Sequence, residues 1–216
     1  MTIKSPFHII EDFVSPLTCE KFIEAHGIKV PSFKDDARTV PFKHEKIITD
    51  NEFVGYLQSN LQDYLPAIQE RYGATINGMS TPIFQQYFED PKNPAELHGC
   101  ENAKFLRKKW VKTKDVDLVC YLWLKEWCNG VPLDPRTDVY GGKLEFPAYD
   151  FSLLPQRGTL VVFPAGPHFI STISPIFVGS LEVVKFSIKL VQNGDGIWLY
   201  QPENFPGTYK DWFSQE

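Results

Sequence analysis

Five short segments rich in β-branched and aromatic residues constrain the fold more than any other feature of this sequence. They are 81–90 (TPIFQQYFED), 117–127 (DLVCYLWLKEW), 143–149 (KLEFPAY), 159–166 (TLVVFPAG) and 182–190 (EVVKFSIKL). Gly, Pro and Asn residues separate them, which is typical of strands joined by turns. Aromatic residues make up 14% of the chain, which also favours strands over a helical bundle. We therefore expect a β-sandwich or barrel here, and we favour a jelly roll.

The first third of the chain carries helix signals instead. A short strand is expected within 7–13, and Ser15 followed by Pro16 predicts the start of a helix that ends near His26. A second helix is predicted from Thr49, where TDNE forms a capping box, and apolar residues then recur at helical spacing. We expect Pro66 inside it to kink or restart the helix, and Gly73 to end it.

Helices followed by many short strands predict an α+β protein. Its core would be a double-stranded β-helix, or jelly roll, with the N-terminal helices packed on one sheet. We expect one domain over 1–216, with mainly helical support in 1–78, the jelly-roll core in 79–192 and a C-terminal tail in 193–216. The segment 128–142 is a long loop, and loops of this length are often functional.

Charge and cysteine usage limit the binding partners and the cellular compartment that we expect. The formal net charge of −5 gives no overall attraction to nucleic acid, although a local groove can still be basic. The N-terminus has no apolar signal core, and no stretch is long enough to span a membrane. The four cysteines have no CxxC pairing, so free thiols and a cytoplasmic location are expected. They are Cys19, Cys100, Cys120 and Cys128.

Two of the five histidines follow predicted strands and are candidate metal ligands. His98 lies beside Glu101 in HGCEN, and His168 follows TLVVFPAGP. Two imidazoles and one carboxylate from separate strands are what a facial Fe(II) site requires. The alternative is that His98 and His168 are unrelated surface residues. The others are expected to be structural or solvent-facing: His8 in the first strand, His26 at a helix end and His44 in a basic loop.

From about residue 7 to 190 the chain resembles the 2-oxoglutarate- and Fe(II)-dependent dioxygenases of the prolyl 4-hydroxylase type, including their phage-encoded relatives. Residues 7–23 resemble their opening strand and first helix. QQYFED, HGCEN and DLVCYLWL resemble their tyrosine-bearing strand, ligand motif and following strand. The most specific match is 141–168, GGKLEFPAYDFSLLPQRGTLVVFPAGPH, because it fixes several glycines and prolines as well as the terminal histidine.

The resemblance implies Fe(II), 2-oxoglutarate as cosubstrate and O₂. Its implied iron ligands are His98, Glu101 and His168. Lys185 would bind the distal carboxylate of 2-oxoglutarate, because a buried cation needs an anion. Lys189 is a weaker option, and Tyr87 and Tyr121 could add hydroxyl contacts or simply pack in the core. The gap from His168 to Lys185 is long for this family, which predicts an inserted loop at about 170–180. Gly141 and Gly142 would form a tight turn into a strand.

HGCEN departs from the family pattern, in which the carboxylate follows the histidine by two positions. Here Glu101 follows His98 by three, and a bulge at Gly99 would restore convergence on one metal. A second arrangement keeps the two-residue spacing and makes Cys100 the ligand, at the risk of thiolate oxidation. A third is a damaged site that binds metal poorly.

The resemblance leaves several substrate classes open. Relatives hydroxylate prolyl residues, other side chains, small molecules or nucleobases, and we favour a protein or peptide over a small molecule or nucleic acid. The run 104–114 carries six basic residues and is expected to be a solvated hairpin, or else a contact for an anionic partner. Two other classes remain open. One is a catalytically impaired jelly-roll binding module, and the other is a cupin-like enzyme with another metal and no 2-oxoglutarate.

Overall fold

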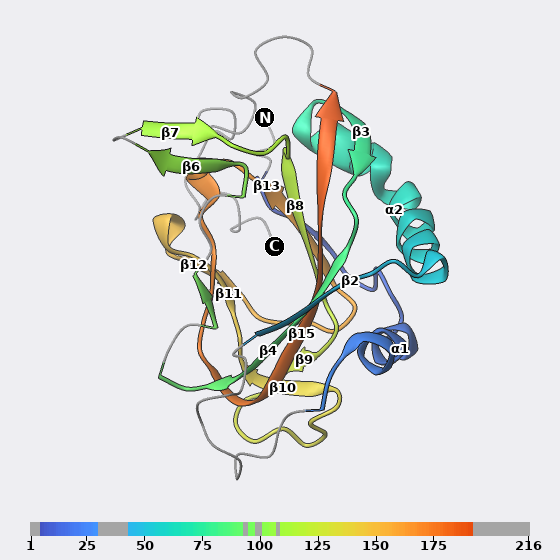
Figure 1. The fold of residues 1–216 in the computed structure, drawn as a ribbon, viewed down its shortest axis with the longest axis vertical. Helices are drawn as coiled ribbons and strands as arrows, with labels where there is room; N and C mark the ends of the chain where they lie inside the picture. Colours follow the sequence, from blue (N-terminus) through green and yellow to red (C-terminus); the bar gives the residue numbers. More distant parts are fainter. Residues whose placement is uncertain (1–4, 30–42, 93–94, 98–100, 107–108, 192–216) are drawn as a thin grey trace.

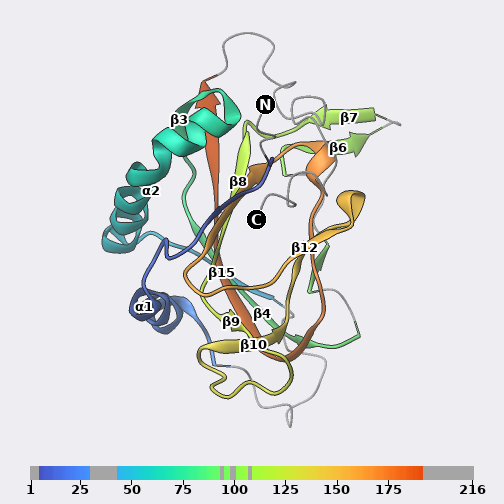
Figure 2. The same ribbon diagram turned by 180° about the vertical axis from the view of Figure 1, so that it is seen from behind.

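The structure is a computed structural model, and it describes residues 5–29, 43–92, 95–97, 101–106 and 109–191. Two sheets form its body, and two helices lie against the larger sheet on the side away from the smaller one (Figures 1 and 2). Ring contacts join the two sheets. The centroid of Phe146, in the smaller sheet, lies 4.9 Å from that of Phe163, in the larger sheet, and Phe7 lies 4.6 Å from Phe146 and 6.4 Å from Phe163. The expected jelly-roll core with helices on one sheet is therefore confirmed.

The larger sheet has nine strands in the described part of the chain. They are β1 (His8–Ile10), β2 (Lys43–Ile47), β3 (Thr75–Met79), β4 (Ile83–Asp90), β8 (Leu118–Trp123), β9 (Glu126–Trp127), β10 (Asp138–Gly141), β13 (Leu160–Pro164) and β15 (Ile176–Val191). The smaller sheet runs in the order β12 (Phe151–Leu153), β11 (Leu144–Phe146), β14 (Thr172–Ile173), β5 (Glu96–Leu97). β6 (Ala103–Leu106) and β7 (Lys109–Lys112) form a separate hairpin, as expected for the basic run.

Both helices form for the reasons that their sequences suggest. In α1 (Pro16–His26), the Ser15 side chain accepts from the Thr18 backbone N–H and proline occupies the first turn. α2 (Asn51–Tyr72) is capped by Asp50 rather than by the predicted Thr49. It continues through Pro66 without a restart and ends at Gly73, which is left-handed at φ 64°.

The strand content differs from the prediction in two places. The basic loop expected around His44 is strand β2, and β3 was not predicted. The loop expected at about 170–180 is also strand, since β14 and the start of β15 occupy it. The extra residues are absorbed by a register irregularity between Ile176 and Ser180 and by Gly179 at φ 91°. β15 is therefore 16 residues long and pairs with four other strands.

Candidate functional site

The predicted cosubstrate residues lie on one face of the larger sheet. Lys185 of β15 is directly opposite Tyr121 of β8, and Leu181, four residues before it, is opposite Tyr87 of β4. Because cross-strand partners and every second residue share a face, Lys185, Tyr121 and Tyr87 point to the same side. The Lys185 ammonium lies 5.3 Å from the centroid of the Tyr121 ring, and both tyrosines are fully buried.

Glu101 is brought to this face by an ion pair with Lys185. The two side chains are 22% and 12% exposed, so the pair is largely withdrawn from solvent. A second cation, Lys114, lies 3.9 Å from the other Glu101 oxygen and is mostly exposed. The predicted carboxylate ligand and the predicted diacid-binding lysine are therefore direct neighbours.

Two pairings link residues on either side of 98–100 to residues on either side of His168. On one side, Leu97 at the end of β5 is opposite Thr172 of β14. On the other side, the Asn102 backbone N–H donates to the Ala165 carbonyl at 3.3 Å. The Asn102 side chain also donates to the Val116 carbonyl at 3.1 Å. Leu97 and Asn102 are thus each linked to the part of the chain that carries His168.

The ligand set itself is only partly within the described residues. His168 lies exposed in the short 3-10 helix η2 (Pro167–Phe169). His98 and Cys100 lie outside the described residues, so their predicted roles stay predictions. Within the described ranges, no group of three His, Cys, Asp or Glu side chains gathers to hold a metal. Glu101 and His168 offer donor types that Fe(II) takes, and they would need His98 to complete the set.

Aromatic residues surround the segment that carries His168. Phe169 stacks on Tyr149 of the 3-10 helix η1 (Pro147–Tyr149) at 5.5 Å between centroids, and it also contacts Phe7. Burial raises the pKa of Tyr149 to about 12, so this phenol stays neutral. The region between the sheets next to η2 is therefore apolar, which is the environment in which a polar reaction centre gains most from excluding water.

A polar chain on the same face was not found from the sequence. Tyr87 donates to the Gln85 side-chain oxygen at 2.9 Å, and Gln85 donates to Glu45 at 2.6 Å. Lys43 pairs with Glu45 at 2.7 Å and lies over the Tyr87 ring. Partial burial would raise the pKa of Glu45, but hydrogen bonds from Lys43 and Gln85 outweigh it and the pKa is lowered. The one sequence signal that could have indicated this polar chain was a pair of adjacent glutamines within an otherwise apolar strand.

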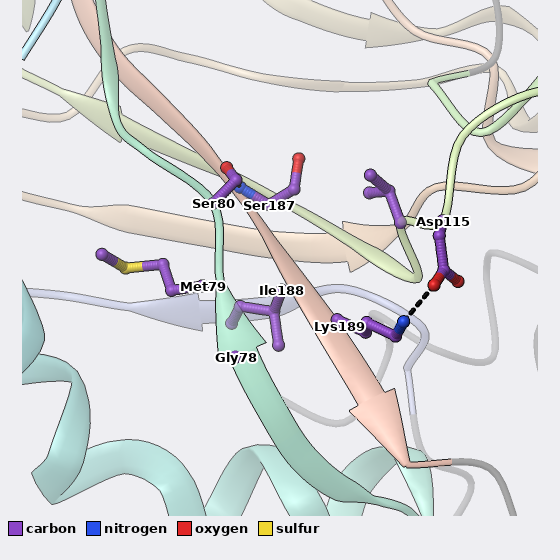
Figure 3. Close-up of a pocket in the computed structure, with 8 residues that line it drawn as sticks. Gly78, Met79, Ser80, Asp115, Ser187, Ile188 and Lys189 are labelled. Atoms are coloured by element: carbon purple, nitrogen blue, oxygen red, sulfur yellow. Dashed lines mark hydrogen bonds and ion pairs between the residues drawn. The ribbon is translucent and has the colours of Figure 1, made fainter.

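Lys189, the weaker option for the cosubstrate, has another partner. Figure 3 shows its ammonium joined to Asp115 at the edge of an open pocket of about 250 Å³. In the same wall, the Ser80 backbone N–H donates to the Ser187 carbonyl at 2.8 Å, and the Ser187 backbone N–H donates to the Ser80 hydroxyl at 2.9 Å. The Lys189 side chain is 45% exposed, so a bound carboxylate would gain less from it than from Lys185.

The sheet order, the paired helices and the long strand β15 define a jelly roll of the kind found in prolyl 4-hydroxylase-like 2-oxoglutarate enzymes. Comparison of the sequence with protein families finds no matching family, and comparison with curated proteins finds no match. The likeness is therefore one of structure.

Three solved structures illustrate this likeness. A viral collagen prolyl hydroxylase from Paramecium bursaria Chlorella virus-1, solved with 2-oxoglutarate, has a TM-score of 0.61 and 15% identity, covering 87% of this chain and 97% of its own. A Pseudomonas putida prolyl 4-hydroxylase has a TM-score of 0.54 and 14% identity, covering 87% and 94%. A Trichoplax adhaerens prolyl hydroxylase in complex with a hypoxia inducible factor peptide has a TM-score of 0.53 and 15% identity, covering 85% and 83%.

Neither described helix is both long and apolar enough to cross a membrane.

Proposed function

We propose that the protein is an Fe(II)- and 2-oxoglutarate-dependent hydroxylase of the prolyl 4-hydroxylase type. The observation that carries the proposal is Lys185, a largely buried cation on the face between the sheets, beside a carboxylate and above an aromatic ring. A jelly roll shared with prolyl hydroxylases supports the same class. Buried cations are costly unless an anion compensates them, and a diacid cosubstrate brings one.

Each residue has a definite task in this proposal. Lys185 donates hydrogen bonds to the distal carboxylate of 2-oxoglutarate, and the rings of Tyr121 and Tyr87 form the surrounding wall. His98, Glu101 and His168 hold the iron, with Cys100 as the less favoured alternative to Glu101. Asn102 positions Glu101 by bonding to two neighbouring segments.

Iron and 2-oxoglutarate, when bound, supply the oxidation of a C–H bond by O₂, with conversion of the cosubstrate to succinate and CO₂. The chain supplies orientation and a dry surrounding. Lys185 would hold one end of the diacid, and Glu101 and His168 would belong to the iron site. The ring contacts of Phe169 would keep water from the apolar part of η2, whereas the His168 side chain is exposed.

A protein or peptide is the substrate class that we favour. The Trichoplax enzyme of similar fold is solved with a peptide fragment, and all three similar structures are prolyl hydroxylases. The basic hairpin β6–β7 is a surface that a peptide could contact, whereas the aromatic-rich strand β8 is buried along its whole length and belongs to the core. A small molecule or a nucleobase is the alternative substrate.

To test the proposal, Fe(II) and 2-oxoglutarate are added to the protein without O₂, and the weak visible charge-transfer band of the iron–2-oxoglutarate chelate is measured. Admission of O₂ should then release succinate, and His168→Ala should lower both signals because a proposed iron ligand is lost. A peptide and metabolite panel, read as the mass gain of one oxygen atom, would identify the substrate. Wild-type protein without the band and without succinate would refute the hydroxylase.

One observation favours a second candidate, a jelly-roll binding module that has lost turnover. Lys185 is already neutralised by Glu101, the carboxylate proposed as an iron ligand. A site that satisfies its own charges needs neither iron nor a diacid for stability. The two candidates differ in their response to metal, because the binding module would bind its partner equally well with a chelator present.

A further inference from the structure

The Lys185–Glu101 ion pair joins two groups that, under the proposed function, must bind different ligands. Lys185 would bind the cosubstrate's distal carboxylate, and Glu101 would bind iron. In the structure each satisfies the other, and only 12% of the lysine side chain and 22% of the glutamate side chain are exposed. The chain therefore holds its own carboxylate where a ligand carboxylate would be expected.

We propose that Glu101 is an internal competitor for the diacid site, and that a divalent cation relieves the competition by drawing Glu101 away from Lys185. The proposal rests on the proposed function and adds a regulatory step to it. Metal binding and diacid binding would then favour each other through this one side chain, in addition to any contact between the ligands.

Charge balance supports the competition. Lys185 carries one positive charge, and the pair with Glu101 is neutral. A diacid carboxylate approaching the intact pair would meet the Glu101 charge at close range, in a partly buried site where solvent screens little. Lys114 offers limited compensation, because it is 3.9 Å away and 63% exposed.

The backbone next to Glu101 allows release without a large rearrangement. The Asn102 N–H bonds to Ala165, its carbonyl accepts from Thr113, and its side chain donates to Val116. The segment is thus anchored, so the proposed release moves the Glu101 side chain while the backbone beside it stays in place. A divalent cation attracts a carboxylate more strongly than an ammonium group does, so a metal nearby would shift this equilibrium.

The test measures glutarate binding by titration calorimetry, with metal removed by a chelator. Glutarate keeps the distal carboxylate but lacks the 2-oxo group, so chelation of a metal through that group cannot contribute. Wild-type protein should bind it weakly, and Glu101→Gln should bind it about tenfold more tightly, because the charged competitor is gone. Added Mn(II) should strengthen binding to wild type and leave Glu101→Gln unchanged within about twofold.

Glu45→Gln is the matched control. Glu45 also exerts a Coulombic effect on this site, but its hydrogen-bond partners are Lys43 and Gln85. It should keep the weak metal-free binding and the Mn(II) effect of wild type. A gain as large as that of Glu101→Gln would overturn the proposal, since general loss of negative charge would then explain both. Lys185→Gln in the Glu101→Gln background should lose the gain, which ties it to the diacid site.

The remaining outcomes separate this inference from the proposed function. Equal metal-free affinities of wild type and Glu101→Gln would overturn the inference, whatever the enzyme does. Tighter binding to Glu101→Gln, with no succinate from iron-loaded wild type, would support the inference and refute the hydroxylase. Absence of glutarate binding in every variant, with and without Mn(II), would overturn the inference, while succinate release by iron-loaded wild type would still support the hydroxylase.

Discussion

Lys185 is the residue on which the chemistry of the site depends most. Replacing it with Gln keeps a polar side chain but removes the charge that a diacid needs. We expect 2-oxoglutarate affinity, measured by calorimetry with Mn(II), to fall by at least about tenfold, since a hydrogen bond to a charged group contributes about 1.5–3 kcal/mol. Lys185→Arg keeps the charge and should retain much of the affinity. Unchanged binding to Lys185→Gln would mean that the diacid binds elsewhere.

Gly141 is a residue whose backbone admits almost no side chain. Its φ is 105°, and a Cβ there would lie 2.3 Å from the Pro175 carbonyl oxygen. Gly141→Ala should therefore lower the free energy of unfolding by about 2–3 kcal/mol in urea titrations. Gly55, exposed in α2 with open space around it, is the control, and Gly55→Ala should add about 0.5–1 kcal/mol. A fully stable Gly141→Ala would show that the turn can rearrange.

At the level of elements, a buried ion pair connects β15 with the segment after β8. Lys125 and Glu182 lie 3.0 Å apart with side chains 3% and 1% exposed, and Lys125 also donates to the Pro135 carbonyl. Glu182→Gln leaves the lysine charge uncompensated and should cost about 3–5 kcal/mol of stability. The double change Lys125→Met with Glu182→Leu should cost less stability than the sum of the losses in Lys125→Met and in Glu182→Leu. Additive losses in a urea double-mutant cycle would contradict this coupling.

The first strand makes the stability depend on pH. Burial, and secondarily the charge of Arg71, lowers the pKa of His8 to about 4 in β1. The unfolded chain binds a proton near pH 6.5, so stability falls as the pH drops from about 6.5 toward 4. Allowing for partial solvent screening, we expect the free energy of unfolding to fall by about 1 kcal/mol over this pH range. His8→Gln should flatten this slope in urea titrations at pH 7 and pH 5, and an unaltered slope would assign it to other groups.

Helices with strong signals in their own sequence were predictable, whereas strands that form only by pairing with other strands were not. Ser15 and Pro16 start α1, and Gly73 ends α2, because caps act within a few residues. β2 is mostly charged or polar and β3 contains Asn77 and Gly78, so neither suggests a strand, and they form because β4 and β15 pair with them. The register that places Tyr121 and Tyr87 beside Lys185 is likewise set by pairing over long sequence distances.

The sequence predicts a set of candidate site residues but not their geometry. The motifs point to Glu101, Lys185 and His168, but nothing in their spacing indicates that Glu101 and Lys185 pair directly. Those two residues lie 84 positions apart, and only the folded sheets bring them together. The exposed position of His168 in η2 was also not foreseen, because the sequence there suggests only the end of a strand.

For the whole molecule, the proposed function predicts stabilisation by its ligands. A ligand that binds only the folded state at 100 times its dissociation constant adds about 2.7 kcal/mol. For a chain of this size, Mn(II) with 2-oxoglutarate should raise the melting temperature by roughly 5–10 °C, and a chelator should reverse the shift. Lys185→Gln is the control that should lose most of the effect of the diacid. No shift in wild type would favour the binding module.

The position of β15 in the chain has a consequence for how the protein is made. β15 pairs with β3, β4, β8 and β10, and in the described part of the chain it alone joins the β2–β4 pair to β8, β13 and β1. It is also the last described strand to leave the ribosome. The larger sheet therefore cannot close while translation is still upstream of residue 176, and the nascent chain must keep its earlier strands from aggregating until then.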